Sequence, residues 1–274
     1  MNENVVKKLW VFFPICLVLL GVKFGYSLQD YSIKYGKEIN AARNLLTDEY
    51  SKEAYDALVA YYDEGKAIDA KLKDKYPECF NPQVSPKEGD VIINGGISDD
   101  LSLTYKMADA IGPKGEIHGF DPNMTIVEKI KKQIADKGYT NVKTHAVGLW
   151  NKNTSKALYF KDNIDGSLVY RANDSVYIPA TLVKLDDYAI KQNIPKIDLI
   201  VLDIEGAEKS ALKGAENILK TQKPDLAISI HHRPQDVFEI INDVNKLGLG
   251  YKFQVGAHSA PRNANNVIMY ATVK

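Results

Sequence analysis

The chain has little cysteine: Cys16 and Cys79 are the only two among its 274 residues. Two isolated cysteines provide neither the spacing of a zinc site nor the framework of a disulfide-stabilised secreted domain. Their scarcity favours a reducing compartment without excluding another.

The sequence also lacks an excess of charge of either sign. Lys plus Arg and Asp plus Glu number 35 each, so the formal net charge at pH 7 is zero. Without a positive excess, the protein as a whole has no electrostatic attraction for nucleic acid or for an anionic membrane surface. We therefore expect no nucleic-acid partner.

Long apolar runs are scarce as well. The longest uncharged run, residues 9–22, lies between Lys7-Lys8 and Lys23 and is interrupted by Pro14. A helix of this length is shorter than the hydrocarbon core of a bilayer, which is about 30 Å thick. The positive flank resembles a signal peptide, but no small-x-small cleavage site follows. We predict that residues 1–26 are an apolar N-terminal segment, buried or on a membrane surface, with a short anchor as the second interpretation.

The rest of the chain has the composition of a globular protein, with 45% hydrophobic and 26% charged residues. Residues 27–76 show apolar positions at three- and four-residue intervals, which predicts helices. Thr47 and Ser51 are the expected helix-starting residues, and three prolines between residues 77 and 86 indicate an extended connector. We predict a helical leader and connector over residues 27–85 and a second domain over residues 86–274.

In the second domain, apolar strand-like runs alternate with helical patterns. Such alternation predicts an α/β fold with a doubly wound, mostly parallel, seven-stranded sheet. The strands of this domain are expected at residues 90–94, 116–120, 142–147, 156–160, 181–185, 197–202, 226–230, 251–255 and 267–273, and the helices at 101–111, 125–137, 208–219 and 235–247.

One strand end is especially informative. Residues 197–202 are apolar except for Asp198, as in a strand that is buried on both faces, and they lead into Asp203-Ile204-Glu205-Gly206-Ala207-Glu208. Open α/β sheets bind ligands beyond the carboxyl ends of their strands, so Asp203 and Glu205 are well placed for chemistry. The structural alternative is that Asp203 caps the following helix while the two glutamates favour its positive end.

The first strand and the second suggest a nucleoside site. Asn94-Gly95-Gly96 ends the first strand before a helix, and Asp121 ends the second, where a carboxylate can bind both ribose hydroxyls. Asp99 and Asp100 would repel a pyrophosphate, which disfavours NAD and favours the cationic S-adenosylmethionine. Alternatively, the glycines only make a tight turn and Asp121 only caps the next helix.

These segments resemble FkbM-type methyltransferases. The resemblance covers the chain from about Gly89 onward and rests on motifs in the family's order: Gly89-Asp90-Val91-Ile92-Ile93-Asn94-Gly95-Gly96, Gly112-Pro113-Lys114-Gly115, Phe120-Asp121-Pro122-Asn123, Asn141-Val142, Leu185-Asp186-Asp187-Tyr188, the Asp203–Glu208 segment and Leu212-Lys213-Gly214-Ala215. It implies a Rossmann-like class I S-adenosylmethionine-dependent methyltransferase that methylates hydroxyls of natural products or carbohydrates. It places cofactor binding on Gly95, Gly96 and Asp121 and an active-site role on Asp203 and Glu205.

Two departures from the family pattern affect the first turn. Asn94 stands where most members have Asp, and Ile97 and Asp100 stand where a small residue and a glycine are usual. Asn94 can accept a hydrogen bond from the cofactor's ammonium group, but without charge assistance. A catalytically silent descendant is therefore an alternative.

The resemblance implies an in-line methyl transfer, for which a base near the acceptor hydroxyl is useful. Asp203 is the first candidate for the base or the substrate anchor. His231, which ends the adjacent strand, is the second, and Glu205 is expected to hold a substrate hydroxyl. A metal site of Asp203, Glu205 and His231 is chemically conceivable, but the spacing matches no standard ligand motif, so we predict no metal.

The leading functional hypothesis is O-methylation of a glycan or similar small molecule. The alternatives are a silent methyltransferase-like binding protein and a nicotinamide-dependent oxidoreductase. Because the methyl donor is made in the cytosol, we expect a cytoplasmic protein, with residues 9–22 providing any contact with the cytoplasmic face of a membrane.

Overall fold

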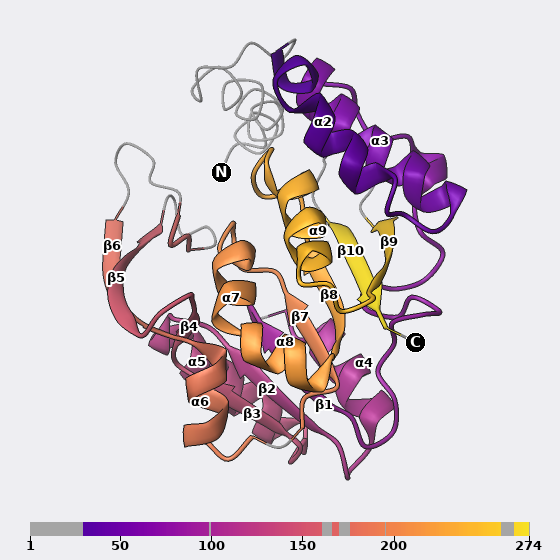
Figure 1. Ribbon diagram of the computed structural model, residues 1–274. Helices are drawn as coiled ribbons and strands as arrows, with labels where there is room; N and C mark the ends of the chain where they lie inside the picture. The colour runs from indigo at the N-terminus through magenta and orange to yellow at the C-terminus, as the bar shows by residue number, and fades with distance from the viewer. Residues whose placement is uncertain are drawn as a thin grey trace, which may run out of the picture.

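A seven-stranded sheet forms the centre of the computed structural model, which describes residues 30–98, 100–160, 166–169, 176–194, 196–258 and 266–273 (Figure 1). The strand order is β3-β2-β1-β7-β8-β10-β9, and only β10 runs antiparallel to its neighbours. The predicted doubly wound, mostly parallel, seven-stranded sheet is thus confirmed. Its strands are β1 (Val91–Gly95), β2 (Glu116–Phe120), β3 (Val142–His145), β7 (Leu199–Leu202), β8 (Asp225–Ser229), β9 (Lys252–Ala257) and β10 (Val267–Thr272).

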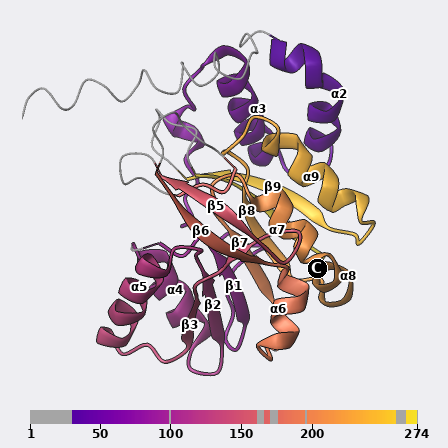
Figure 2. The same cartoon turned by 90° about the vertical axis from the view of Figure 1, so that its left-hand side faces the viewer.

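Helices cover both faces of this sheet, so its central strands are buried on both sides (Figure 2). The continuous apolar runs of β1, β7 and β8 follow from this double cover, because successive side chains point to opposite faces. Ile92 packs with the core that includes residues of α4, and Ile93 packs with the core that includes residues of α6 to α9. The helices are α4 (Ser102–Ile111) and α5 (Met124–Asp136) on one face, and α6 (Leu185–Lys191), α7 (Glu208–Gly214), α8 (Glu216–Gln222) and α9 (Asp236–Lys246) on the other.

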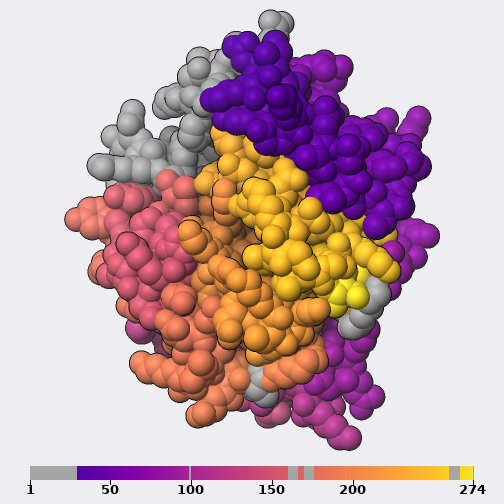
Figure 3. Space-filling model, viewed as in Figure 1, coloured from indigo at the N-terminus to yellow at the C-terminus, as the bar shows by residue number. Residues whose placement is uncertain are grey.

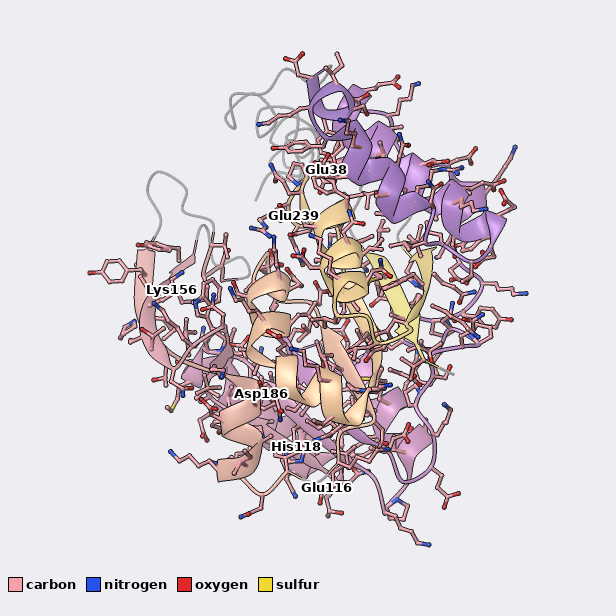
Figure 4. All side chains as sticks on the ribbon, in the orientation of Figure 1. Glu38, Glu116, His118, Lys156, Asp186 and Glu239 are labelled. Carbon is pink, nitrogen blue, oxygen red and sulfur yellow. The ribbon has the colours of Figure 1, made fainter. Side chains whose placement is uncertain are left out.

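The single helix expected over residues 208–219 is in fact two, α7 and α8. A Cβ atom on Gly214, the last residue of α7, would lie 2.0 Å from the carbonyl oxygen of Trp150, so only a glycine fits where α7 ends against this backbone. Asp186 of α6, labelled in Figure 4, lies beside the start of α8. Its carboxylate accepts hydrogen bonds from the amides of Asn217 (3.1 Å) and Ile218 (3.0 Å). Asp186, part of the family-like motif, thus stabilises this helix start.

A small second sheet extends from one side of the molecule, with the order β4-β6-β5. It consists of β4 (Gly148–Leu149), β5 (Thr154–Phe160) and β6 (Val176–Val183). The sequence predicted β5 and the end of β6, but β4 has only two residues and gives no periodic signal.

The N-terminal helices α2 (Tyr31–Arg43) and α3 (Glu49–Glu64) pack against α9 and β9 (Figures 1 and 3). The hydroxyl of Tyr31 donates to the carbonyl oxygen of Pro234 at 2.6 Å, and the buried Leu58 belongs to the same apolar core as the sheet. Beyond Glu64 the predicted helix continues only as the short 3-10 turn η3 (Ala70–Leu72).

Two predicted helix starts were wrong by a few residues. Asp48, rather than Thr47 or Ser51, caps α3 by accepting the amide of Ser51. Likewise Asn123 caps α5, two residues before the expected start. Short side chains with an acceptor oxygen compete for this role, and sequence alone does not rank them.

The predicted apolar segment 9–22 lies outside the described residues, and the domain boundary near residue 85 stays a prediction. Within the described part of the chain, no helix has the length and apolar character needed to cross a bilayer.

Candidate active site

Two cavities meet beyond the carboxyl ends of the central strands. Their volumes are about 460 Å³ and about 380 Å³, and both are lined by Gly96, Ser98, Asp100 and Asp203. The meeting point lies where β1 and β7 are neighbours, because their loops leave the sheet side by side.

The smaller cavity brings together most of the residues predicted to act here. Gly95, Gly96, Asp121, Asp203 and Glu205 all line it. Among the described residues lining this cavity there is no Lys or Arg, whereas Asp100 adds another carboxylate. Such an acidic lining suits a cationic ligand and not a pyrophosphate.

Asn94 and Asp121 have structural contacts of their own. Asn94 lines the larger cavity only, and its Nδ2 donates to Oγ1 of Thr104 at 3.3 Å. Asp121 accepts the amide of Asn123 at 2.7 Å while also lining the smaller cavity. Asp121 therefore does not cap α5, as the structural alternative had it, because Asn123 does; Asp121 holds the turn before that helix and lines the cavity.

The glycine turn after β1 makes the closest contact in the site. Gly96 has a φ of 88°, and a Cβ atom there would lie 1.8 Å from the carbonyl oxygen of Asp203. Only glycine accepts this backbone conformation readily and leaves room for the loop that follows β7. Gly96 thus sets the distance between the two loops.

A buried carboxylate organises the loop after β7. Glu208 is fully buried, and its Oε1 accepts hydrogen bonds from the amides of Ile204 (2.8 Å) and Gly206 (3.4 Å). Between these amides Glu205 has a φ of 54°, in the left-handed region that is unfavourable for a residue with a Cβ atom. Such strained residues concentrate at functional sites.

His232 lies among three carboxylates. Its Nδ1 is 2.9 Å from Oε1 of Glu208, and its Nε2 is 3.2 Å from Oδ1 of Asp203 and 3.6 Å from Oε1 of Glu205. Burial opposes protonation, but the carboxylates, Glu208 foremost, raise the pKa of His232 well above its usual value.

The effect on Asp203 is reciprocal. Its side chain is 47% exposed in the cleft. Desolvation opposes ionisation, but hydrogen bonds and charge from His232, with a further bond from Ser229, lower the pKa of Asp203 to about 2. The histidine and the carboxylate thus each favour the charged form of the other.

His231 points elsewhere. Its Nδ1 donates to the carbonyl oxygen of Val267 and its Nε2 accepts the amide of Asn266, both at 3.3 Å. Desolvation and the nearby His232 lower the pKa of His231. Asp203 is contacted by His232, and neither His232 nor Glu208 was predicted from the sequence to act at the site.

Comparison with known proteins places this arrangement in a family. A model of the methyltransferase FkbM domain matches residues 89–253. The chain belongs to the FkbM methyltransferase family. In this family the cofactor is S-adenosylmethionine, and the acidic, glycine-lined smaller cavity fits a sulfonium compound.

A solved structure of the same family shares the fold. The crystal structure of methyltransferase FkbM from Methylobacillus flagellatus KT matches with a TM-score of 0.67 and 17% identity, over 89% of this chain and 60% of that chain. The chain thus spans less than two thirds of that protein. Aeropyrum pernix fibrillarin, in complex with natively bound S-adenosyl-L-methionine, matches with a TM-score of 0.46 and 16% identity, over 80% of this chain and 76% of that chain. No curated protein is significantly similar in sequence.

Proposed function

We propose that the protein methylates a hydroxyl group of a glycan or a similar hydroxylated metabolite. The observation that supports this most is the position of Asp203, where a cofactor-sized acidic cavity meets a second cavity of about 460 Å³. A methyl acceptor in the second cavity would approach the cofactor at the carboxylate of Asp203.

The cofactor supplies an electrophilic methyl group, which is transferred as its carbon–sulfur bond breaks and a carbon–oxygen bond forms. Gly95 and Gly96 would let the backbone approach it closely, and Asp121 would bind its ribose hydroxyls. Asn94 is proposed as a contact for its ammonium group from the side of the larger cavity.

Asp203 would hold the acceptor hydroxyl and take its proton. A carboxylate with a pKa of about 2 is a weak base. It is sufficient here, because the acceptor oxygen becomes strongly acidic as its new bond to carbon forms. His232 would fix the orientation of Asp203, and Glu205 would hold a second hydroxyl of the acceptor. His231, the other candidate base, forms its hydrogen bonds with the backbone of Val267 and Asn266 and not with Asp203.

The lining of the larger cavity favours a polyhydroxylated acceptor. Hydrogen-bonding side chains line much of it, among them Glu78, Asn94, Thr104, Lys106, Ser229 and Asn266. Sugars expose many hydroxyls and bind through such groups. We also propose a cytoplasmic location, where the methyl donor is made. If residues 9–22 contact the membrane, a lipid-linked glycan is the natural acceptor.

A second candidate is a methyltransferase-like protein that binds its ligand without catalysis. The first turn favours it, because Asn94 is bonded to Thr104 and Asp100 accepts the amide of Ser102 at 3.0 Å. Asn94 and Asp100 are both positions at which the chain departs from the family pattern, and both side chains are engaged in contacts within the protein. We do not propose the nicotinamide alternative, given the acidic lining of the smaller cavity.

The test combines binding and turnover in the full chain. Calorimetric titration should show binding of S-adenosylmethionine and its demethylated product but not of NAD. With labelled methyl donor and a glycan panel, Asp203→Asn should reduce methyl transfer by about 10² to 10⁴ while the product still binds. Asp187→Asn, an exposed acid on α6, is the matched control and should retain activity.

Two outcomes would contradict the proposal. Full activity in Asp203→Asn would remove Asp203 from the mechanism. Cofactor binding without methyl transfer to any hydroxylated acceptor would favour the silent binding protein.

A further inference from the structure

Two loops bring three potential metal ligands together. Asp203 follows β7, and His231 and His232 follow the neighbouring strand β8. One ligand atom from each residue lies within 4.8 Å of the other two. Ligands of one ion are about 3 to 3.5 Å apart when each bond is about 2.1 Å long, so small side-chain rotations would complete the site.

Each imidazole ring has an oxygen atom close to its Nδ1. Nδ1 of His232 lies 2.9 Å from Oε1 of Glu208, and Nδ1 of His231 lies 3.3 Å from the carbonyl oxygen of Val267. An acceptor at Nδ1 keeps the proton there and leaves the lone pair of Nε2 for an ion. Among the described residues, only the amide of Asn266, at 3.3 Å, competes with an ion for Nε2 of His231.

The charge of the surroundings also favours a cation. Asp203, Glu205 and Glu208 all approach His232, whose side chain is nine-tenths buried. In the described part of the chain, no Lys or Arg forms an ion pair with these three carboxylates. Glu208 is fully buried, and its Oε2 has no hydrogen-bond partner among the described atoms. A buried negative charge of this kind is stabilised by a bound cation.

We propose that Asp203, His231 and His232 bind one divalent first-row transition-metal ion, through Nε2 of each histidine and an oxygen of Asp203. Two imidazoles favour ions such as Zn²⁺, Co²⁺ or Fe²⁺ over Mg²⁺ and Ca²⁺, which prefer oxygen ligands.

The role of the ion deepens the methyltransferase proposal and rests on it. Three protein ligands leave coordination positions open, and Asp203 lines both cavities. An acceptor hydroxyl that binds the ion becomes more acidic, and two neighbouring hydroxyls of a sugar can bind it together. The spacing along the chain did not predict this site, because its ligands come from separate strands.

The test is titration of the chelator-treated full chain with Co²⁺, followed by visible absorption, together with calorimetry with Zn²⁺. We expect one equivalent to bind. His231→Asn and His232→Asn should each weaken binding at least tenfold, and Glu208→Gln, which removes the charge behind His232, about tenfold. His258→Asn, a histidine bonded to Tyr270 outside the cluster, is the matched control and should bind normally.

A measurement on the unmodified protein covers the case in which a variant does not fold. Paramagnetic Co²⁺ should broaden the NMR signals of the His231 and His232 side chains before those of His258. Absence of one-equivalent binding, or undiminished binding in both histidine variants, would overturn the site. Binding of the demethylated cofactor, measured on the same samples, reports separately on the methyltransferase proposal, so the two can fail independently.

Discussion

Glu208 is the residue on which the geometry of the site depends most. It is fully buried, it accepts two amides of the loop after β7, and it lies beside His232, which in turn contacts Asp203. A buried carboxylate is unfavourable unless hydrogen bonds and charge compensate for it. The hydrogen bonds from the strained loop and the contact with the imidazole of His232 compensate for the burial of Glu208.

The ion pair makes stability depend on pH in a defined direction. The folded-state pKa of His232 is raised above its ordinary value of 6.5, so its contribution is complete below about pH 6.5 and is lost as pH rises through the folded-state pKa. The pKa of Asp203 is lowered from 3.8 to about 2, so its contribution is present above about pH 4 and is lost as pH falls towards 2. The pair stabilises the fold most between these limits.

Glu208→Gln should weaken this dependence. Removing the largest favourable charge lowers the folded-state pKa of His232, so the decrease in unfolding free energy above pH 6.5 should become smaller. The variant should also lose about 1 to 3 kcal/mol of stability near neutral pH. Urea unfolding between pH 5.5 and 8.5, with NMR titration of His232, measures both effects.

Glu239→Gln is the matched control, since Glu239 forms a partly exposed ion pair with Lys209. It should change stability by less than about 0.5 kcal/mol, with no change in the titration of His232. An unchanged pH dependence in Glu208→Gln would show that Glu208 does not set the charge of His232.

At this scale the sequence predicted the acids better than the histidines. Asp203 and Glu205 follow an apolar run, and their position at the strand end fixes their surroundings. His231 and His232 come after the end of β8 at Ser229. Beyond a strand, successive side chains no longer have to point to opposite faces of the sheet. Which imidazole faces the acids depends on that irregular path, so the sequence did not indicate that His232 is the one in contact with Asp203.

Among the elements, the contact between the loops after β1 and β7 joins the two halves of the site. The parallel pairing of β1 with β7 brings Gly95 opposite Leu202, so the next residues of each strand leave the sheet together. The sequence predicted these strand ends to within two residues, because continuous apolar runs mark buried strands. It did not predict the break between α7 and α8, where Gly214 lies against the backbone of Trp150.

Gly96→Ala should destabilise the protein through this contact. The new methyl group would overlap the carbonyl oxygen of Asp203, so one loop must move, and overpacking of this kind costs about 1 to 3 kcal/mol beyond the backbone strain. Gly138→Ala is the matched control, because its φ is 81° and no atom lies within 4 Å of the added Cβ. Its unfolding free energy should fall by only about 1 to 2 kcal/mol, the cost of the left-handed backbone conformation for a residue with a Cβ atom.

Denaturant unfolding of both variants gives the difference between these costs. Calorimetry should further show weaker binding of the demethylated cofactor in Gly96→Ala and not in Gly138→Ala. Equal destabilisation and equal binding in the two variants would mean that the loop contact contributes nothing beyond local strain.

At the scale of the whole molecule, α2 and α3 complete the apolar core on one face of the sheet. Tyr31 and Tyr35 contact the ring of Phe238 on α9, about 200 residues away along the chain, and Tyr62 donates to the carbonyl oxygen of His231 beside the site. The helical period of the leader predicted an apolar face on these helices. It carried no information on which distant element that face covers, since such a partner is determined only when the sheet has formed.

A shared core predicts that the described parts of the molecule unfold together. Leu58→Ala in α3 removes a fully buried side chain and should lower the unfolding free energy by about 2 to 5 kcal/mol. In a Trp10→Phe background, fluorescence reports on Trp150 alone, which packs against the apolar cluster of the small sheet. The midpoint measured by Trp150 fluorescence should therefore fall as much as the midpoint measured by far-UV circular dichroism.

Ile33→Ala on α2 is the control for this comparison, because Ile33 is 82% exposed. It should shift neither midpoint appreciably, since exposed side chains contribute little. If Leu58→Ala lowered the circular dichroism midpoint and left the Trp150 midpoint unchanged, α2 and α3 would be an independent unit. Coincident shifts would instead mean that these helices stabilise the same cooperative structure that holds Asp203, His232 and both cavities, because a core common to all of them cannot be lost in parts.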